Sequence, residues 1–279
     1  MKERCFSLNT VTLAALDNEG EGPVIIGLHG FLDNANSLLP LMPYFHRYRF
    51  IALDLAGHGR SSHRSKDAEY NQADYLQDLH ALITHEGWSN VILLGHSLGG
   101  ILATLYAGLF PEHVSAVISL DSCGPLTRPG ESAATQMREA IVSRAEKRSS
   151  QPGAANLERA VEARCKVSDM RPDDARLILE RNMLTQPDGT QTWSSDPRVR
   201  TKSVLRMTES QAQSVMRSID CPLLFTAASD SFKKAREVYG TRQAWFADAR
   251  CIDFEGGHHV HMEQPGETAK AIIHFVEQM

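Results

Sequence analysis

The feature that most constrains the fold is a series of short, continuous apolar runs, each typical of a strand buried on both faces. The runs lie at 24–28, 50–53, 91–94, 117–120 and 222–226. Segments with apolar residues at helical spacing, such as 74–87 and 99–110, separate several of them. This alternation predicts an α/β fold in which a parallel sheet has helices on both faces. Two further runs, at 6–8 and 11–16, predict a hairpin at the start of the chain.

The middle of the chain has a different pattern. Between residues 125 and 219 strand-like runs are absent, charge is high, and the spacing predicts helices at 131–148, 155–167 and 172–184. The charges between 131 and 182 are of mixed sign, which indicates a solvated face rather than a binding patch. We therefore expect a core formed by 1–124 and 220–279, with 125–219 inserted as a helical cap, or lid. Met183 and Trp193 of this cap are expected to contact the substrate.

The hexapeptide Gly95-His96-Ser97-Leu98-Gly99-Gly100 joins an expected buried strand to an expected helix. A G-x-S-x-G pattern in this context is typical of a nucleophile elbow, a turn so tight that the residues two positions before and two positions after the serine must be glycine. The turn would hold the Ser97 hydroxyl at the helix N-terminus, where the helix dipole favours developing negative charge. Ser97 is therefore the candidate nucleophile, and His96 beside it is expected to be structural.

A second loop, at 28–33, follows the first long apolar run. Its position predicts that the backbone N–H of Phe31 forms an oxyanion hole together with the N–H of Leu98. His29 is expected to fix this loop by hydrogen bonds to neighbouring backbone. Asp33 either anchors the loop or faces the pocket. The Gly-rich turn at 54–61 is expected to belong to the scaffold.

Three histidines, His258, His259 and His261, lie between the last expected strand and the last expected helix. A histidine in a Gly-rich loop at this position can reach the serine hydroxyl and act as its general base. Three histidines in four positions could also bind zinc, but no fourth ligand with suitable spacing is apparent. We expect neither a metal nor an organic cofactor.

A catalytic triad also needs a carboxylate that orients the imidazole, and two candidates follow strand-like runs. Asp121 ends the run at 117–120, and Asp230 comes shortly after the run at 222–226. Both could reach the histidine, because neighbouring parallel strands end at the same edge of a sheet. We favour Asp121, since a charge at the end of an apolar run is unfavourable without a partner. Asp230 is kept as the alternative acid, although it could instead cap the helix that follows it.

Together these motifs resemble those of the α/β-hydrolase superfamily. The matching patterns are H-G-F at 29–31, D-x-x-G-H-G-x-S at 54–61, G-H-S-L-G-G at 95–100 and G-x-H at 256–258. More narrowly, the segments 29–37 and 258–265, with Asp121 and the residues 124–126, 188–189 and 193, resemble the serine hydrolase-like protein group and its bacterial relatives. The resemblance implies a mostly parallel eight-stranded sheet, Ser97 as nucleophile and His258 as base.

The same resemblance bears on the acid. The superfamily's commonest acid position falls on Asp230, whereas in the narrower group the acid stands at the position of Asp121. Residues 227–229 read Ala-Ala-Ser and depart from the glycine that usually follows this strand, which weakens the assignment of Asp230.

The expected activity is that of a carboxylesterase-like serine hydrolase, which cleaves a small ester or thioester through an acyl-enzyme. Lactone opening, carbon–carbon bond hydrolysis or acyl transfer to an alcohol on the same triad remain alternatives, and so does a non-catalytic ligand-binding homologue. A serine at position 97 argues against dehalogenase or epoxide hydrolase chemistry, which uses an aspartate nucleophile in this fold.

Composition agrees with a small-molecule partner. Acidic residues number 34 against 29 basic, and the resulting net charge of −5 gives no electrostatic reason to bind nucleic acid or an anionic membrane. No stretch approaches the roughly 20 apolar residues of a membrane helix. Five scattered cysteines without a C-x-x-C pair predict reduced thiols in a cytoplasmic protein. The sequence specifies neither the acyl group of the substrate nor the oligomeric state.

Overall fold

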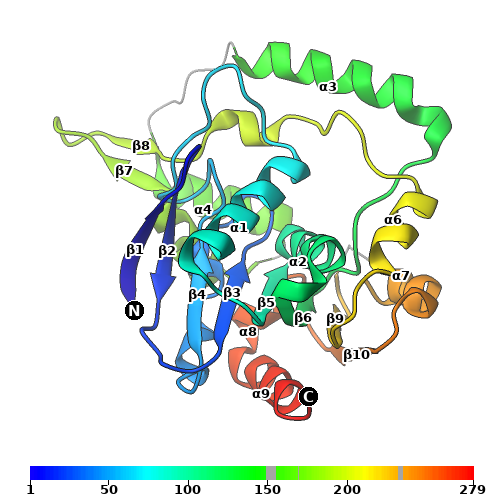
Figure 1. Ribbon diagram of the computed structural model, residues 1–279. Coiled ribbons are helices and arrows are strands. Elements are labelled where there is room, and N and C mark those ends of the chain that lie inside the picture. The colour runs from blue at the N-terminus through cyan, green and yellow to red at the C-terminus, as the bar shows by residue number, and fades with distance from the viewer. Residues whose placement is uncertain (149–154, 169, 232–234) are drawn as a thin grey trace.

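A twisted eight-stranded sheet forms the centre of the computed structural model, which describes residues 1–148, 155–168, 170–231 and 235–279 (Figure 1). The strand order is β1-β2-β4-β3-β5-β6-β9-β10. The pairs β1–β2 and β2–β4 are antiparallel, and the remaining pairs of this sheet are parallel. The predicted eight-stranded, mostly parallel sheet is thus confirmed. Its strands are β1 (Lys2–Ser7), β2 (Thr12–Asp17), β3 (Val24–Leu28), β4 (Arg49–Leu53), β5 (Val91–His96), β6 (Val114–Leu120), β9 (Leu223–Ala228) and β10 (Ala249–Phe254).

Helices cover both faces of this sheet. Successive residues of a strand point to opposite faces, so a strand made of apolar residues presents an apolar surface on each side. In β5, Val91 and Leu93 belong to one buried apolar cluster, and Ile92 and Leu94 belong to the other. The first cluster includes residues of α1 (Gln72–Glu86) and α2 (Leu98–Leu109), with α7 (Ala235–Arg242) packed against it. The second includes residues of α9 (Pro265–Val276), which follows the short helix α8 (Val260–Glu263). None of the helices in the described ranges has the length and apolar character needed to cross a bilayer.

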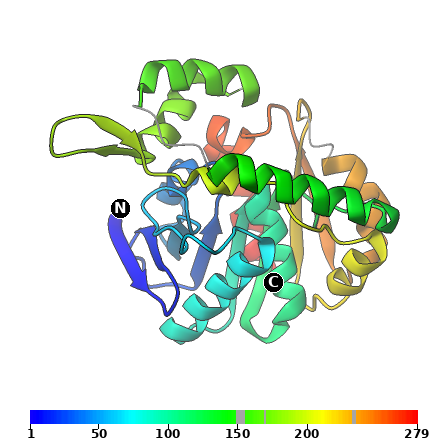
Figure 2. The ribbon, with the colours of Figure 1, turned by 90° about the horizontal axis from the view of Figure 1, so that it is seen from above.

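The segment 125–219 contributes α3 (Ala133–Arg148), α4 (Leu157–Ser168), α5 (Pro172–Arg181) and α6 (Glu209–Met216). Both ribbon views place α3 above α1 and α2 (Figures 1 and 2). Helices α4 and α5 pack on each other through Val161 and Ile178, with Met262 of α8 in the same cluster. Helix α6 instead packs on α2 of the core, where Met216 is fully buried.

The same segment contains a feature that the sequence did not predict. Strands β7 (Met183–Thr185) and β8 (Gln191–Trp193) form a two-stranded antiparallel sheet. The hairpin projects from the body of the molecule (Figure 1) and turns at Gly189, whose φ is 82°. Each strand has only three residues, too few for a two-residue periodicity to be visible in the sequence.

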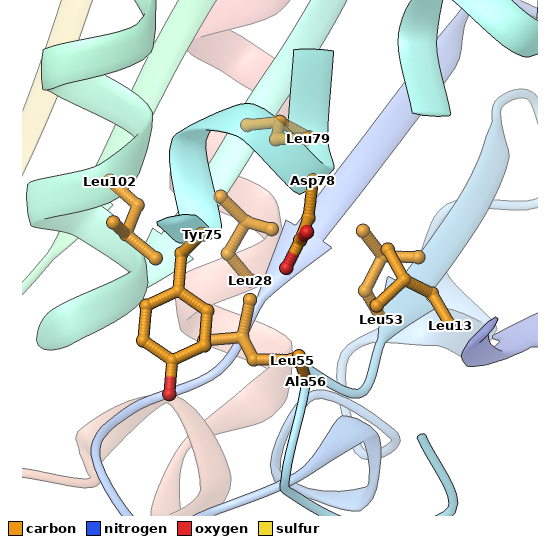
Figure 3. A pocket seen from close by; sticks show the side chains of 9 residues that line it. All are labelled: Leu13, Leu28, Leu53, Leu55, Ala56, Tyr75, Asp78, Leu79 and Leu102. Atoms are coloured by element: carbon orange, nitrogen blue, oxygen red, sulfur yellow. The ribbon is translucent and has the colours of Figure 1, made fainter. Parts of the chain in front are cut away.

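A small cavity inside the first apolar cluster is a packing gap of the core. Its volume is about 10 Å³, and its walls include Leu28, Leu53 and Leu102 (Figure 3). Asp78 also faces it, and its carboxylate pairs with the Arg64 guanidinium at 2.5 Å. A space of this size holds one water molecule at most, so it is not a ligand site.

Candidate active site

Ser97 occupies the sharp turn between β5 and α2. Its φ of 51° lies in the left-handed region, which is strained for a residue with a side chain, and its N–H donates to Leu120 O at 2.9 Å. A Cβ atom at Gly95 would lie 2.2 Å from backbone atoms of Gly99, and one at Gly99 would lie 2.0 Å from Leu28 O. The two flanking glycines are therefore required by close backbone approach, as the sequence pattern predicts.

His258 and Asp121 lie in direct contact at the carboxyl end of the sheet. His258 Nδ1 is 2.5 Å from Asp121 Oδ2, and both side chains are buried. Asp121 also accepts hydrogen bonds from the Ser231 hydroxyl and, at 3.0 Å, from the N–H of Ala228. An ionised carboxylate can only accept, so the proton between the two groups belongs to His258 Nδ1. A neutral imidazole in this tautomer has its basic lone pair on Nε2.

Burial and hydrogen bonding set the charge states of this pair. Burial lowers the pKa of His258 to about 4, although the hydrogen bond with Asp121 opposes this effect. Burial alone would raise the pKa of Asp121, but the bonds from His258, Ser231 and Ala228 outweigh it and leave that pKa below its ordinary value. At neutral pH the pair is therefore a neutral imidazole beside a carboxylate, as a general base requires.

Asp230, the alternative acid, is the residue before Ser231 in the chain. Its side chain is exposed, and its backbone N–H donates to Gly256 O at 2.9 Å. Within the described residues the carboxylate that reaches His258 is that of Asp121.

His96 links the histidine loop to the Ser97 elbow. The ring of His96, the residue before Ser97, donates from Nε2 to the backbone oxygen of His258 at 2.9 Å. The ring centroids of His96 and His258 lie 4.6 Å apart. The His96 side chain thus has a structural role, as expected. Its role is to hold the loop that carries His258 beside the Ser97 turn.

The side chain of His29 holds the loop 29–33 by hydrogen bonds, and the loop contains one residue with a strained backbone. His29 Nε2 accepts from the N–H of Leu55 at 3.0 Å, and Nδ1 lies 2.7 Å from Gly30 O. Leu32 has a φ of 65°, a genuine outlier for a bulky residue.

Among the described residues, no acceptor is bonded to the N–H of Phe31 or of Leu98. Both N–H groups are therefore available as oxyanion donors.

A cavity of about 440 Å³ contains Ser97 in its wall. Phe31 and Leu98 line the same cavity, so the structure brings the proposed nucleophile and both proposed donor residues to one space. Many of the remaining lining residues belong to the segment 125–219. Met183 and Trp193 do not belong to that wall: they pair with each other across the β7–β8 hairpin, so the expectation that they contact the substrate is not met.

A buried polar cluster lies behind the loop 29–33. Asp33 is 1% exposed and accepts from His259 Nε2 at 3.1 Å and from the guanidinium of Arg164 in α4. His96 Nδ1 lies 3.5 Å from the same carboxylate. Burial would raise the pKa of Asp33, but Arg164 and then His259 hold it well below its ordinary value.

This cluster also contains possible metal ligands. Atoms of Asp33, His96 and His259 lie within 4.8 Å of one another, which is a set of oxygen and nitrogen donors that could hold a metal ion. Arg164 already pairs with the Asp33 carboxylate, so a cation would lie beside a fixed positive charge. The donor set therefore fits a metal poorly.

Residues 23–265 match the alpha/beta hydrolase fold family. The chain belongs to this family. A serine hydrolase-like protein of zebrafish (Danio rerio) is 29% identical over 271 residues, which cover 92% of this chain and 82% of that protein. The solved structure of a hypothetical protein from Pseudomonas aeruginosa PAO1 is similar with a TM-score of 0.88 and 32% identity, over 98% of this chain and 96% of that chain. These matches confirm the resemblance stated from the motifs, and the relatives' name supports hydrolase activity.

A third similarity concerns the fold alone. The thioesterase domain from the curacin biosynthetic pathway has a TM-score of 0.82 at 23% identity, over 98% of this chain and 99% of that chain. The similarity of fold therefore extends over most of the segment 125–219 as well as the sheet.

Several residues of the site were not predicted from the sequence. Ser231, which bonds to Asp121, and Arg164, which bonds to Asp33, lie 110 and 131 positions from their partners, so no local pattern connects them. A group of basic residues could have been found from the sequence. Between 198 and 206 the chain has four basic residues and no acidic one, and this run lies beyond the stretch of mixed charge at 131–182.

Proposed function

We propose that this α/β hydrolase is a serine hydrolase that cleaves a small carboxylic ester or thioester through an acyl-enzyme intermediate. Ser97 is the nucleophile, His258 is the general base, and Asp121 orients the imidazole. One observation carries the assignment: His258 Nδ1 contacts Asp121 Oδ2 at 2.5 Å, on a loop that His96 holds beside the Ser97 turn. Asp230 is the alternative acid. Its side chain is exposed, and among the described residues the carboxylate in contact with His258 is that of Asp121, which argues against Asp230.

In the first half of the reaction, His258 Nε2 takes the hydroxyl proton of Ser97 while Oγ attacks the carbonyl carbon. The carbonyl oxygen becomes an oxyanion, for which the N–H groups of Phe31 and Leu98 are the proposed donors. The tetrahedral intermediate then collapses, and the imidazolium returns its proton to the leaving alcohol or thiol. The product is an ester between Ser97 and the acyl group.

In the second half, His258 removes a proton from a water molecule that attacks the acyl carbon. Collapse of the second intermediate releases the acid and returns the proton to Ser97. Ser97, His258, Asp121 and one water molecule supply every electron pair and proton that this cycle needs. The proposed steps use neither a metal nor an organic cofactor.

The segment 125–219 is proposed to act as a cap over a core formed by 1–124 and 220–279. Its residues form the wall of the cavity that faces Ser97, so it would select the acyl or alcohol group. Helix α6 anchors the end of this segment on α2 through the buried Met216. The hairpin β7–β8 projects away and is not assigned a part in substrate binding (Figure 1).

Labelling with a fluorophosphonate tests the nucleophile, and a panel of p-nitrophenyl esters of increasing acyl length tests the activity. Wild-type protein is expected to be labelled and to release p-nitrophenol, whereas Ser97→Ala is expected to lose the label and about 10⁴-fold of kcat. Transfer of the acyl group to an added alcohol in preference to water would favour an acyltransferase. Activity on lactones or on carbon–carbon bonds but not on linear esters would favour those alternatives. A folded protein that is neither labelled nor active would be a non-catalytic homologue.

A further inference from the structure

Cationic side chains are concentrated on the cap wall of the Ser97 cavity. Arg128, Arg200, Lys202 and Arg206 line it, together with the carboxylate of Glu139. Lys202 Nζ pairs with Glu139 at 2.9 Å. The guanidinium groups of Arg128, Arg200 and Arg206 have no ion pair within the part of the chain that the structure describes. Four cationic side chains and one carboxylate thus line the cavity, which gives its wall a net positive charge.

This arrangement differs from that of other arginines in the described residues. Many are paired: Arg164 with Asp33, Arg181 with Asp54, Arg198 with Asp196 and Arg242 with Glu209. The whole chain has a net charge of −5, so the cavity has the opposite sign to the protein around it.

The unpaired charges also act on one another. Partial burial, and then the charge of Arg128, lower the pKa of Arg206. Like charges around one half-enclosed space repel, and an anion placed among them removes that repulsion. A guanidinium group is well suited to such an anion, because its fork of N–H donors matches a carboxylate or a phosphate.

The wall on the core side has a different character. Phe31, Tyr75 and Ile101 line it beside Ser97. The cavity is thus apolar near the nucleophile and cationic on the cap side, and its volume of about 440 Å³ is that of a small-molecule site. A substrate that fills it would place an ester carbonyl at one end and a negative charge at the other.

We propose that the enzyme selects esters or thioesters that carry an anionic group, a carboxylate or phosphate, bound by Arg128, Arg200 and Arg206 while the carbonyl lies at Ser97. This inference rests on the hydrolase function proposed above and names its substrate class. The anion belongs either to the acyl part or to the leaving group, because the same guanidinium chemistry recognises both.

Two pairs of matched substrates test it. The first pair compares the p-nitrophenyl monoester of adipic acid with the p-nitrophenyl ester of adipic acid monoamide, which has the same shape without the charge. The second pair compares S-butyryl-4′-phosphopantetheine with S-butyryl-pantetheine, which differs from it only by the missing phosphate. The quantity measured is the ratio of kcat/KM between the charged and the neutral member of each pair. We expect a ratio of about 10 or more in one pair, which identifies the part of the substrate that carries the anion.

Substitutions then connect this ratio to the arginines. Arg128→Gln, Arg200→Gln and Arg206→Gln are each expected to lower the ratio several-fold toward one, and added salt is expected to lower the ratio of the wild type. Arg217, an exposed residue that follows α6 and does not line the cavity, provides the matched control. Arg217→Gln should leave the ratio unchanged. Both members of a pair are measured on the same protein preparation, so a misfolded fraction lowers both kcat/KM values equally and does not change their ratio.

Ratios near one in both pairs, or ratios that the three variants leave unchanged, would overturn the inference while leaving the hydrolase function in place. If no substrate is cleaved and Ser97 is not labelled by a fluorophosphonate, the proposed function has failed instead. Calorimetric titration of the protein with adipate then decides the anion site separately. Binding that Arg206→Gln weakens by about 10-fold supports the site, and absence of binding overturns it.

Discussion

Replacement of Asp121 by asparagine separates the two candidate acids. Asp121 accepts from His258, from Ser231 and from the N–H of Ala228. In the variant, the amide oxygen can keep the bond from Ala228, but an NH₂ group then faces His258 and Ser231. An NH₂ group donates and cannot accept from the imidazole. His258 must then accept at Nδ1 and carry its proton on Nε2, the atom that should take the proton of Ser97.

The expected loss follows from this change of tautomer. The imidazole is still present but as the wrong tautomer, so kcat/KM should fall by about 10³- to 10⁴-fold, which corresponds to about 4 to 5.5 kcal/mol of transition-state stabilisation. Asp230→Asn is the matched control. The Asp230 side chain is exposed, and the bond from its N–H to Gly256 belongs to the backbone, so this variant should remain close to wild type.

The assay is hydrolysis of a p-nitrophenyl ester across a pH series, with thermal unfolding of each variant as a check on folding. For wild type, kcat/KM should fall as the pH drops through the pKa of His258, about 4, because only the neutral imidazole is a base. A large loss in Asp230→Asn with Asp121→Asn within tenfold of wild type would refute the assignment. Loss only in the double variant would show that the two carboxylates substitute for each other.

Three further outcomes are expected. His258→Ala should lose about as much activity as Ser97→Ala, whereas His259→Ala should lose far less, and a dominant loss at His259 would contradict the register. Arg164→Met leaves the buried Asp33 carboxylate without its ion-pair partner and should lower the free energy of unfolding by about 3 kcal/mol, while Arg176→Met at an exposed pair should leave the unfolding midpoint nearly unchanged. Burial lowers the pKa of His29 to about 4 and that of His58 to about 3, so the unfolded chain binds more protons below pH 6.5. The unfolding free energy measured in urea should therefore fall between about pH 6 and pH 4, by up to about 1.4 kcal/mol per pH unit for each histidine, and a flat profile would contradict this.

The parts of the fold that could be predicted have local signatures. A buried parallel strand is a continuous apolar run, and the nucleophile turn has glycines because backbone atoms approach within 2.2 Å of the Gly95 Cβ position. The hairpin β7–β8 has no such signature. The helices of 125–219 were located because their apolar positions repeat at helical spacing. The predicted helix at 172–184 was too long, because α5 ends at Arg181 and a strand begins at Met183.

The parts of the site that could not be predicted depend on contacts between distant segments. His96 was expected to be structural, but its bond to the carbonyl of His258 spans 162 positions. Ser231 and Arg164 are ordinary polar residues in sequence, and only the fold places them on Asp121 and Asp33. The cationic residues of the cavity wall were not predicted for a different reason. They lie at 128 and between 200 and 206, outside the stretch 131–182 whose mixed charges indicated a solvated face.

The buried Asp33 gives a physical reason why the cap, the loop 29–33 and the histidine loop keep one relative position. A carboxylate that is 1% exposed is strongly unfavourable unless its partners stay in place. Those partners come from separate segments: Arg164 from α4, His259 from the histidine loop, and His96 from the end of β5. Any shift of α4 away from the core would leave this charge partly unpaired. The proposed oxyanion donor Phe31 lies two residues before Asp33, so the ion pair that holds the cap would also hold the geometry of the oxyanion hole.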